Sequence, residues 1–331
     1  MVIESGSAGN MTAEKEYQGF VHSALLYHSQ REYVDFLAGF VGEGLAMDEP
    51  VLVAVPGESM ALLRDELCGA GSALPAGLQM ADSTVVARNP SRFMAMQVAF
   101  AGHHPDRRVR IVSEVFWPGR TANEVLACEQ HEALVNEALE HYQVTGLCLY
   151  DASRLDEEVL TSGPATHPVL WRSGSLQRNA AYAPKVVLAR CNQPISPNPE
   201  AATYLVQDKA DLRPARSFAI DYAAGVGLSR DAMWDLQLVA TELATNSLMH
   251  GGACRLALWR SDDHLVCEAR DKGRLDDPLA GRLNPGPSGP AGRGLFLVNA
   301  VSDLVRAHTT PTGTTIQAYL PFVRSSPSPT G

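Results

Sequence analysis

The chain has 331 residues, of which 45% are hydrophobic and 19% charged, a composition typical of globular protein. This length suffices for two domains, each with its own core. The formal net charge of -10 disfavours a nucleic-acid or anionic-membrane surface, because either needs clustered Lys and Arg. We therefore expect a protein or small-molecule partner.

Two further features bear on the compartment. No apolar run approaches the roughly 18 residues that a membrane span needs, and no basic segment followed by an apolar one opens the chain. The six cysteines form no C-x-x-C pair, and Cys148, Cys254 and Cys267 lie in apolar runs, as reduced core cysteines do. The sequence predicts a cytoplasmic protein with no membrane contact.

The first half alternates strand-like with helix-like apolar patterns. Strands are expected at 22–28, 50–56, 77–81, 109–117 and 144–151, and helices at 30–46, 58–69, after Pro90, and at 121–141. This alternation is typical of an α/β domain with a mostly parallel sheet covered by helices on both faces. The runs VLVAV and VTGLCLY are expected to be central strands, because neither has a polar side.

Proline and glycine are frequent between residues 162 and 200, where we place the domain junction. KVVLA at 185–189 is a candidate strand that closes the first domain or docks on the second. The predicted organisation is a disordered arm, a first domain, a linker, a second domain and a disordered tail, over residues 1–18, 19–180, 181–200, 201–322 and 323–331.

The second half has clustered strands and few helices. Strands are expected at 203–206, 255–260, 264–270, 305–309 and 314–320, and helices at 211–226, 229–251 and 294–304. This order indicates an α+β two-layer sandwich, with helices on one face of a mixed sheet.

The clearest helix pattern begins at Ser229, a plausible N-cap, and stops at Gly251. Beside its apolar stripe, Glu242, Asn246 and His250 follow one another at i, i+4 and i+8. This spacing places the three polar side chains along one line. We expect them to point into a cleft together.

Two later segments add groups that suit a nucleotide. A strand ends at Asp271, whose carboxylate can accept a hydrogen bond from an adenine amine, and Gly273 lets a base approach the backbone. The segment Pro285 to Gly294, PGPSGPAGRG, runs into a helix, and helix N-termini present free N–H groups to phosphate.

Together, Glu-x-x-x-Asn, Asp-x-Gly, Gly-x-Gly and Gly-Thr-Thr in this order resemble the GHKL ATPase superfamily. ELATNSLMHG, RDKGRLDDPLAGR and GRGLFLVNAVSD look most like bacterial anti-sigma factor serine/threonine kinases, over about residues 202–321. The resemblance implies the GHKL (Bergerat) fold, with ATP and Mg²⁺ as cofactors. It makes Glu242 the general base, Asn246 the Mg²⁺ ligand, Asp271 and Gly273 the adenine site, Gly292, Arg293 and Gly294 the phosphate site, and His250 and Thr314 secondary contacts.

The function implied is a cytoplasmic, signal-responsive protein kinase that acts on a sigma factor or its antagonist. One alternative is a non-catalytic ATP-binding protein that sequesters such a partner. A second is a cytoplasmic histidine kinase, which is disfavoured because no dimerisation helix pair and no phosphoacceptor histidine box are found. His22, His131 and His167 are interpreted as core or pocket histidines. Whether the chain forms a homodimer stays open.

The first domain resembles the MEDS sensory domain over about residues 20–180, on the segments HSALLYHS, DEPVLVAVP, ARNPSRF, SEVFWPGR and CEQHEALVN. The fold implied is a P-loop-like α/β sheet. No Gly-x-x-x-x-Gly-Lys-Ser/Thr motif follows the first strand, so nucleotide hydrolysis by this domain is not expected.

Open α/β sheets bind ligands at the carboxyl edge of the sheet. Glu114 and Trp117 follow one strand, and His131 and Glu132 lie on one predicted helix. With His22, these residues are our candidates for a ligand-sensing pocket. Structural packing explains the same residues equally well, and a metal site of His22, Glu114 and His131 is a minor hypothesis.

Overall fold

The computed structural model describes residues 19–69, 72–286 and 292–322. Contacts divide the chain into two compact units, the first formed by residues up to Arg88 with Met96–Ala189, the second by Asn89–Ala95 with the chain from Arg190 onward. The predicted arm, the predicted tail and the middle of the glycine-rich loop lie outside the described residues. Each unit is described by itself.

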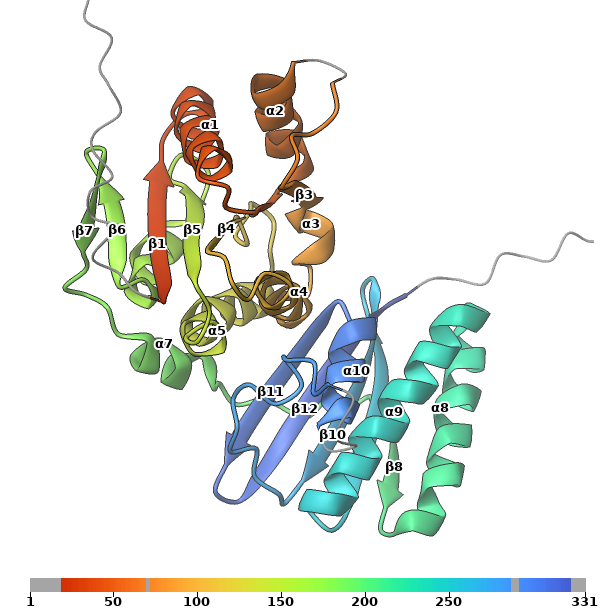
Figure 1. Cartoon of the computed structure of the whole chain (residues 1–331). Coiled ribbons are helices and arrows are strands. Elements are labelled where there is room, and N and C mark those ends of the chain that lie inside the picture. Colours follow the sequence, from red (N-terminus) through yellow and green to blue (C-terminus); the bar gives the residue numbers. More distant parts are fainter. Residues whose placement is uncertain (1–18, 70–71, 287–291, 323–331) are drawn as a thin grey trace, which may run out of the picture. The chain divides into compact units, whose positions relative to one another are not determined.

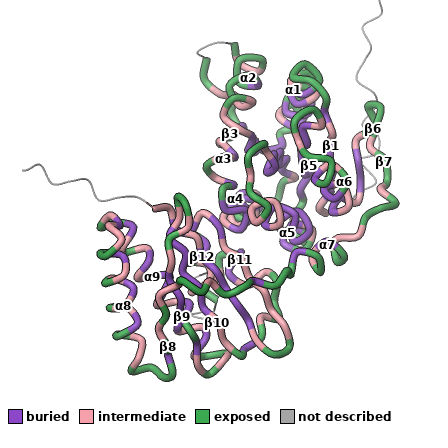
Figure 2. The backbone as a smooth tube through the Cα atoms, turned by 180° about the vertical axis from the view of Figure 1, so that it is seen from behind, coloured by how far each residue is buried: buried purple, intermediate pink, exposed green. Residues whose placement is uncertain are grey.

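The first unit is built on a seven-stranded sheet of order β3-β2-β4-β5-β1-β6-β7. Its strands are β1 (Phe20–Tyr27), β2 (Val51–Val55), β3 (Leu78–Asp82), β4 (Val109–Ser113), β5 (Val144–Asp151), β6 (Val169–Arg172) and β7 (Ser175–Arg178). All neighbours are parallel except β6 and β7. The predicted mostly parallel sheet is therefore confirmed. β5 is its central strand and is buried along its whole length (Figure 2), and β2, which lies between β3 and β4, is also fully buried.

Helices cover both faces of this sheet. They are α1 (Gln30–Ala46), α2 (Gly57–Cys68), α3 (Ser83–Val86), α4 (Pro90–Gly102), α5 (Ala122–Ala138), α6 (Glu157–Ser162), the 3-10 turn η2 (Gly163–Thr166) and α7 (Pro184–Cys191). Leu147 and Leu149 of β5 pack with α1 and α2, whereas Cys148 faces the side covered by α4 and α5. This alternation follows from the two-residue period of a strand.

Some local expectations for this unit were wrong. β4 ends at Ser113, so residues 114–117 form a loop, and the short edge hairpin of β6 and β7 was not predicted. The candidate strand KVVLA is helical, as part of α7. Pro184 suits the first position of a helix. Val187 and Cys191, four residues apart, are both buried on one face of α7, and this burial favours a helix although the β-branched valines of the segment favour a strand.

The second unit is a two-layer sandwich. Its strands, β8 (Ala202–Val206), β9 (Cys254–Ser261), β10 (His264–Asp271), β11 (Leu304–Thr310) and β12 (Gly313–Pro321), form a sheet of order β11-β12-β10-β9-β8. Every neighbouring pair is antiparallel, so the expected mixed sheet was wrong. The tight turns from β9 to β10 and from β11 to β12 can join only antiparallel strands.

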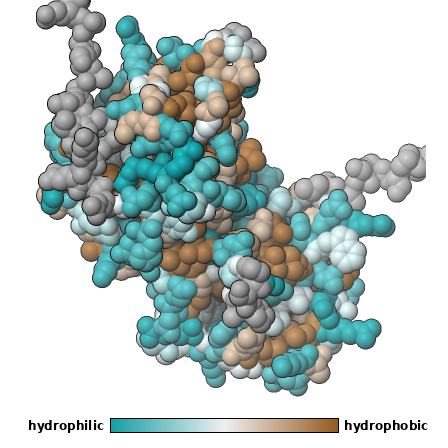
Figure 3. Space-filling model, viewed as in Figure 1, coloured by the Kyte–Doolittle hydropathy of each residue, from teal (hydrophilic) through white to brown (hydrophobic). Residues whose placement is uncertain are grey.

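The second layer holds the 3-10 turn η3 (Lys209–Asp211) and the helices α8 (Leu212–Val226), α9 (Arg230–His250) and α10 (Arg293–Val301). The three α-helices lie on one face of the sheet, and their apolar residues share one core with β9, β10 and β12 (Figure 1). Among the described residues, no helix is both long and apolar enough to span a membrane. Hydrophilic residues surround smaller apolar patches on the face drawn in Figure 3.

Candidate functional site

Helix α9 carries the polar line that the sequence predicted. The Ser229 side chain caps its first turn by accepting from the Ala232 N–H, and the helix ends at His250, directly before Gly251. Glu242 and Asn246 are half-buried at the border of the apolar core. The exposed His250 lies one turn further on, at the helix end.

The start of α10 lies directly against this line. A Cβ atom on Gly294 would lie 2.7 Å from Glu242 Oε2 and 3.0 Å from Asn246 Nδ2. The preceding Gly292 has φ 85°, a left-handed conformation that favours glycine. Backbone N–H groups in the first turn of a helix lack helical partners and carry partial positive charge. A carboxylate, an amide and a helix N-terminus therefore meet at one place.

Asp271, the last residue of β10, has its carboxylate held from two sides. Ser247 of α9 donates its hydroxyl to Oδ2 at 2.6 Å, and the Gly273 N–H donates to Oδ1 at 2.7 Å. A Cβ atom on Gly251 would lie 2.6 Å from Asp271 Oδ1. A Cβ atom on Gly273 would lie 2.7 Å from the His250 carbonyl oxygen. Only glycine fits this approach of the β10 turn to the end of α9.

Thr314 lies opposite Asp271 in the β10–β12 ladder and donates its hydroxyl to the Gly273 carbonyl at 2.9 Å. Its oxygen is also 3.0 Å from Thr309 Oγ1. Arg293 is exposed and donates to the Gly286 carbonyl at 3.2 Å. Sequence reasoning missed Ser247 and Thr309. The position of Ser247, next to Asn246 on the same helix, was the signal available.

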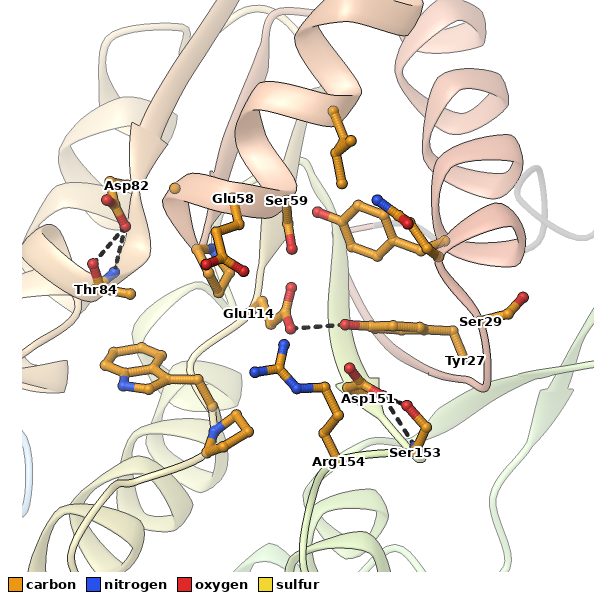
Figure 4. A pocket seen from close by; sticks show the side chains of 17 residues that line it. Tyr27, Ser29, Glu58, Ser59, Asp82, Thr84, Glu114, Asp151, Ser153 and Arg154 are labelled. Atoms are coloured by element: carbon orange, nitrogen blue, oxygen red, sulfur yellow. Dashed lines mark hydrogen bonds between the residues drawn. The ribbon is translucent and has the colours of Figure 1, made fainter.

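The first unit has a polar pocket at the carboxyl edge of its sheet, here called the edge pocket (Figure 4). Five parallel strands end at it, contributing Tyr27, Pro56, Asp82, Glu114 and Asp151. Trp117 and Arg154 complete the wall, and the Arg120 guanidinium stacks 3.5 Å from the centre of the Trp117 ring. Of the predicted sensing residues, Glu114 and Trp117 line this pocket.

Glu114 is the central acid of the edge pocket. Burial raises its pKa to about 8, although the Tyr27 hydrogen bond and the Arg154 charge act in the opposite direction. Tyr27 donates to Glu114 Oε1 at 3.0 Å. At neutral pH the carboxyl is therefore mostly protonated and can donate a hydrogen bond to a ligand.

The other candidates lie on the sheet face that α5 covers: His22 on β1, and His131 and Glu132 on α5 itself. His131 lines a small cavity there, together with His22 and Cys148. The structure thus separates Glu114 from His22 and His131, so the metal site proposed from those three residues is wrong. It brings His22 together instead with Glu132, Cys148 and His167, here called the buried cluster. Sequence reasoning had not linked the last two residues to it.

The fold and the site describe a histidine kinase-like ATPase domain that follows an open α/β domain. Two family models match the chain: the MEthanogen/methylotroph, DcmR Sensory domain over residues 21–168, and the Histidine kinase-like ATPase domain over residues 205–320. Residues 21–168 are therefore a MEDS domain and residues 205–320 a domain of the histidine kinase-like ATPase family, and the resemblance to both families is confirmed. No curated protein matches the sequence.

Three solved structures show fold similarity to parts of the chain. The RsbU and RsbW domains of a Mycobacterium tuberculosis protein are 18% identical over 40% of this chain and 34% of that one, with a TM-score of 0.30. The SiaB–SiaC complex from Pseudomonas aeruginosa is 15% identical over 36% and 88%, with a TM-score of 0.31. Acinetobacter baumannii histidine kinase AdeS is 12% identical over 52% and 88%, with a TM-score of 0.21. These TM-scores are low, so the likenesses carry no weight for function.

Proposed function

We propose that the second unit binds ATP with Mg²⁺ between α9, the turn after β10 and the start of α10. The observation that carries this proposal is the contact of Gly294 with Glu242 and Asn246, where even a methyl group would approach to 2.7 Å. The missing side chain keeps the helix N-terminus open beside a carboxylate and an amide oxygen. Helix N–H groups suit phosphate, and oxygen donors suit Mg²⁺, so these residues fit the cofactors.

Each residue then has a separate task. The Asp271 carboxylate, oriented by Ser247 and the Gly273 N–H, accepts the adenine amine. Asn246 offers its amide oxygen to the metal ion. The first N–H groups of α10, with Gly292, Arg293 and Gly294, bind the phosphates, and His250 and Thr314 lie at the margin of the site. Bound ATP would supply the phosphoryl group.

The activity we propose is serine/threonine protein kinase activity. Glu242 removes the proton from a partner's hydroxyl group, that oxygen bonds to the terminal phosphorus, and the bond from phosphorus to ADP breaks. The motifs around Glu242 and Gly294 look like those of anti-sigma factor kinases, so the proposed partner is a sigma factor antagonist, with or without the sigma factor. His22, His131 and His167 are at most 1% exposed, which disfavours these three residues as phosphoacceptors.

The test begins with ATP titrations of the full chain, with and without Mg²⁺. We expect Mg²⁺-dependent binding that Asn246→Ala weakens at least tenfold, because the metal loses its protein ligand. Asn198→Ala, a change in the segment before β8 and outside the site, should bind as the wild type does. Equal affinities for all three proteins would refute the cofactor site.

Labelled ATP and a purified sigma factor antagonist then test the chemistry. Glu242→Gln should bind ATP but transfer no phosphate, because the amide keeps the shape of the carboxylate and loses the base. Wild-type rates in that variant would reduce Glu242 to a structural group. Binding without transfer by the wild type would instead favour a sequestering protein.

We propose a second function for the first unit: the edge pocket binds a small polar ligand and controls the ATPase domain. The edge pocket offers a ligand both hydrogen-bond donors and acceptors, from the ends of five strands, the neutral Glu114 carboxyl group and the Arg154 guanidinium. We also propose that the sheet is P-loop-like without nucleotide hydrolysis, since β1 passes through His28 and Ser29, the N-cap of α1, without a glycine-rich loop.

Coupling predicts that a ligand changes ATP affinity, and that ATP changes ligand affinity by the same factor. ATP affinity of the full chain is measured with and without small-molecule extract from the native cell. Trp117→Ala should abolish the response by opening the pocket wall, whereas Trp234→Ala, whose side chain is 65% exposed on α9, should retain it. An identical response in wild type and Trp117→Ala would rule out sensing at the edge pocket.

A further inference from the structure

The buried cluster lies on the α5 side of the first sheet. Its members come from four separate elements: His22 from β1, Glu132 from α5, Cys148 from β5 and His167 from the residue after η2. None is more than 6% exposed, and their potential ligand atoms all lie within 4.8 Å of one another. Buried polar groups need partners. The hydrogen-bond partners of these four side chains therefore decide which of their atoms carry a proton.

The two imidazole rings have fixed tautomers. The Asn136 amide NH₂ donates to the carbonyl oxygens of Glu132, Ala133 and Thr166, so its oxygen, 3.1 Å from His22 Nδ1, can only accept. His22 Nδ1 must therefore carry a proton. His167 Nδ1 lies 3.0 Å from the Gly163 carbonyl, which also can only accept. In the neutral rings, both Nε2 atoms are left with a lone pair.

These lone pairs converge on the carboxylate of Glu132. Its Oε2 lies 3.2 Å from His22 Nε2 and 3.3 Å from His167 Nε2. Even so, neither Glu132 oxygen nor His167 Nε2 makes a hydrogen bond of good geometry in the described structure. Cys148 Sγ completes the group, 3.2 Å from His22 Nε2. With both Nε2 atoms unprotonated, the Cys148 thiol is the only donor among these described groups, and loss of its proton would leave four electron-rich atoms that suit a cation.

We propose that His22, Glu132, Cys148 and His167 form a binding site for a divalent transition-metal ion of the zinc class. Ligands at about 2.0–2.3 Å around a tetrahedral ion lie about 3.3–3.6 Å from one another. The three distances of 3.2 to 3.3 Å given above are close to this range. Two neutral imidazoles, a carboxylate and a thiolate would balance a charge of +2. Imidazole and thiolate donors select zinc-like ions over Mg²⁺ or Ca²⁺.

The surroundings match those of metal-bound histidines. A metal-ligating histidine commonly donates its second N–H to a carbonyl oxygen, as Nδ1 of both rings does here. Ser113 Oγ lies 3.3 Å from Cys148 Sγ and can donate to a thiolate. Since β1, β5, α5 and the segment between η2 and β6 all contribute, a bound ion would tie the centre of the sheet to its covering helix.

The experiment uses Co²⁺ as a spectroscopic probe for the full chain after treatment with a chelator. We expect one equivalent to bind, with a thiolate-to-cobalt charge-transfer band and the intense visible bands of a tetrahedral site. Cys148→Ala should lose the charge-transfer band and bind at least tenfold more weakly. Cys128→Ala, which removes another buried thiol of the same unit, should behave as the wild type does.

Two outcomes would overturn the proposal: wild-type protein that binds no Co²⁺, or a charge-transfer band that survives in Cys148→Ala. The first would mean that one imidazole holds a proton against Glu132 and the cluster is only a polar core network. Thermal unfolding provides a second readout. Zn²⁺ should raise the Tm of wild type and Cys128→Ala but not that of His167→Ala, because an ion stabilises only a state that binds it.

Discussion

Replacement of Asp271 by Asn tests the proposed adenine site most directly, because its structural consequence can be worked out atom by atom. In the wild type, Oδ1 accepts from the Gly273 N–H and Oδ2 from the Ser247 hydroxyl. The asparagine oxygen can keep the Gly273 bond, and the Ser247 hydroxyl can rotate to accept from the new NH₂ group. The protein fold should therefore change little in stability.

Nucleotide binding, in contrast, should suffer. In the proposed site a carboxylate oxygen accepts the adenine amine. The variant would present a second donor there, and a hydrogen bond to a charged group would be lost. Such a bond contributes about 1.5–3 kcal/mol, which corresponds to about ten- to hundredfold weaker binding. Titration calorimetry with Mg²⁺ and ATP measures the loss, and a thermal melt of each protein checks the fold.

Asp262→Asn is the matched control, with the same change of charge on an exposed turn outside the site. Its φ of 48° is one that asparagine adopts readily. Its ATP affinity should equal that of the wild type. If folded Asp271→Asn binds ATP within twofold of the wild type, Asp271 does not recognise the base and the reasoning fails.

Gly294→Ala should weaken ATP binding at least tenfold, because the added methyl group would lie 2.7 Å from the Glu242 carboxylate on α9. Gly225→Ala, which has open space around it, should bind ATP as the wild type does, and titration calorimetry compares the two variants. Burial raises the pKa of Glu114 from 4.5 to about 8, so between these pH values the folded protein holds a proton that the unfolded chain releases. The Tm should therefore fall as the pH rises from 4.5 to 8, and Glu114→Gln should flatten this dependence. Arg110→Met leaves Glu49 without its 2.6 Å buried partner and should lower the free energy of unfolding by about 3–5 kcal/mol in urea titrations.

The sequence by itself determined most elements of both units. The helix expected over 30–46 is α1, with the same ends, and Ser229 caps α9 as the pattern required. Such features depend on local causes: apolar spacing of 2 or 3.6 residues, and capping groups within one turn. The order of the nucleotide motifs was readable for the same reason, since each motif is a short local segment.

Local patterns failed where stability came from packing elsewhere. The edge hairpin of β6 and β7 has few buried residues and left little signal in the sequence. Residues 185–189 have strand-forming side chains, yet the burial of Val187 and Cys191 four residues apart made them helical. The all-antiparallel sheet of the second unit depended on strand pairing that no single segment encodes.

Only the tertiary structure decided which polar groups meet. Parallel pairing of β1 with β5 sets His22 beside Gly146 and Ala24 beside Cys148, which brings a histidine and a cysteine 126 residues apart into contact. In the second unit, the end of β10 reaches α9 so that Ser247 can hold Asp271. Contacts of this kind depend on sheet register and on helix placement over a sheet. Those are properties of the whole core, to which each residue contributes only a small part.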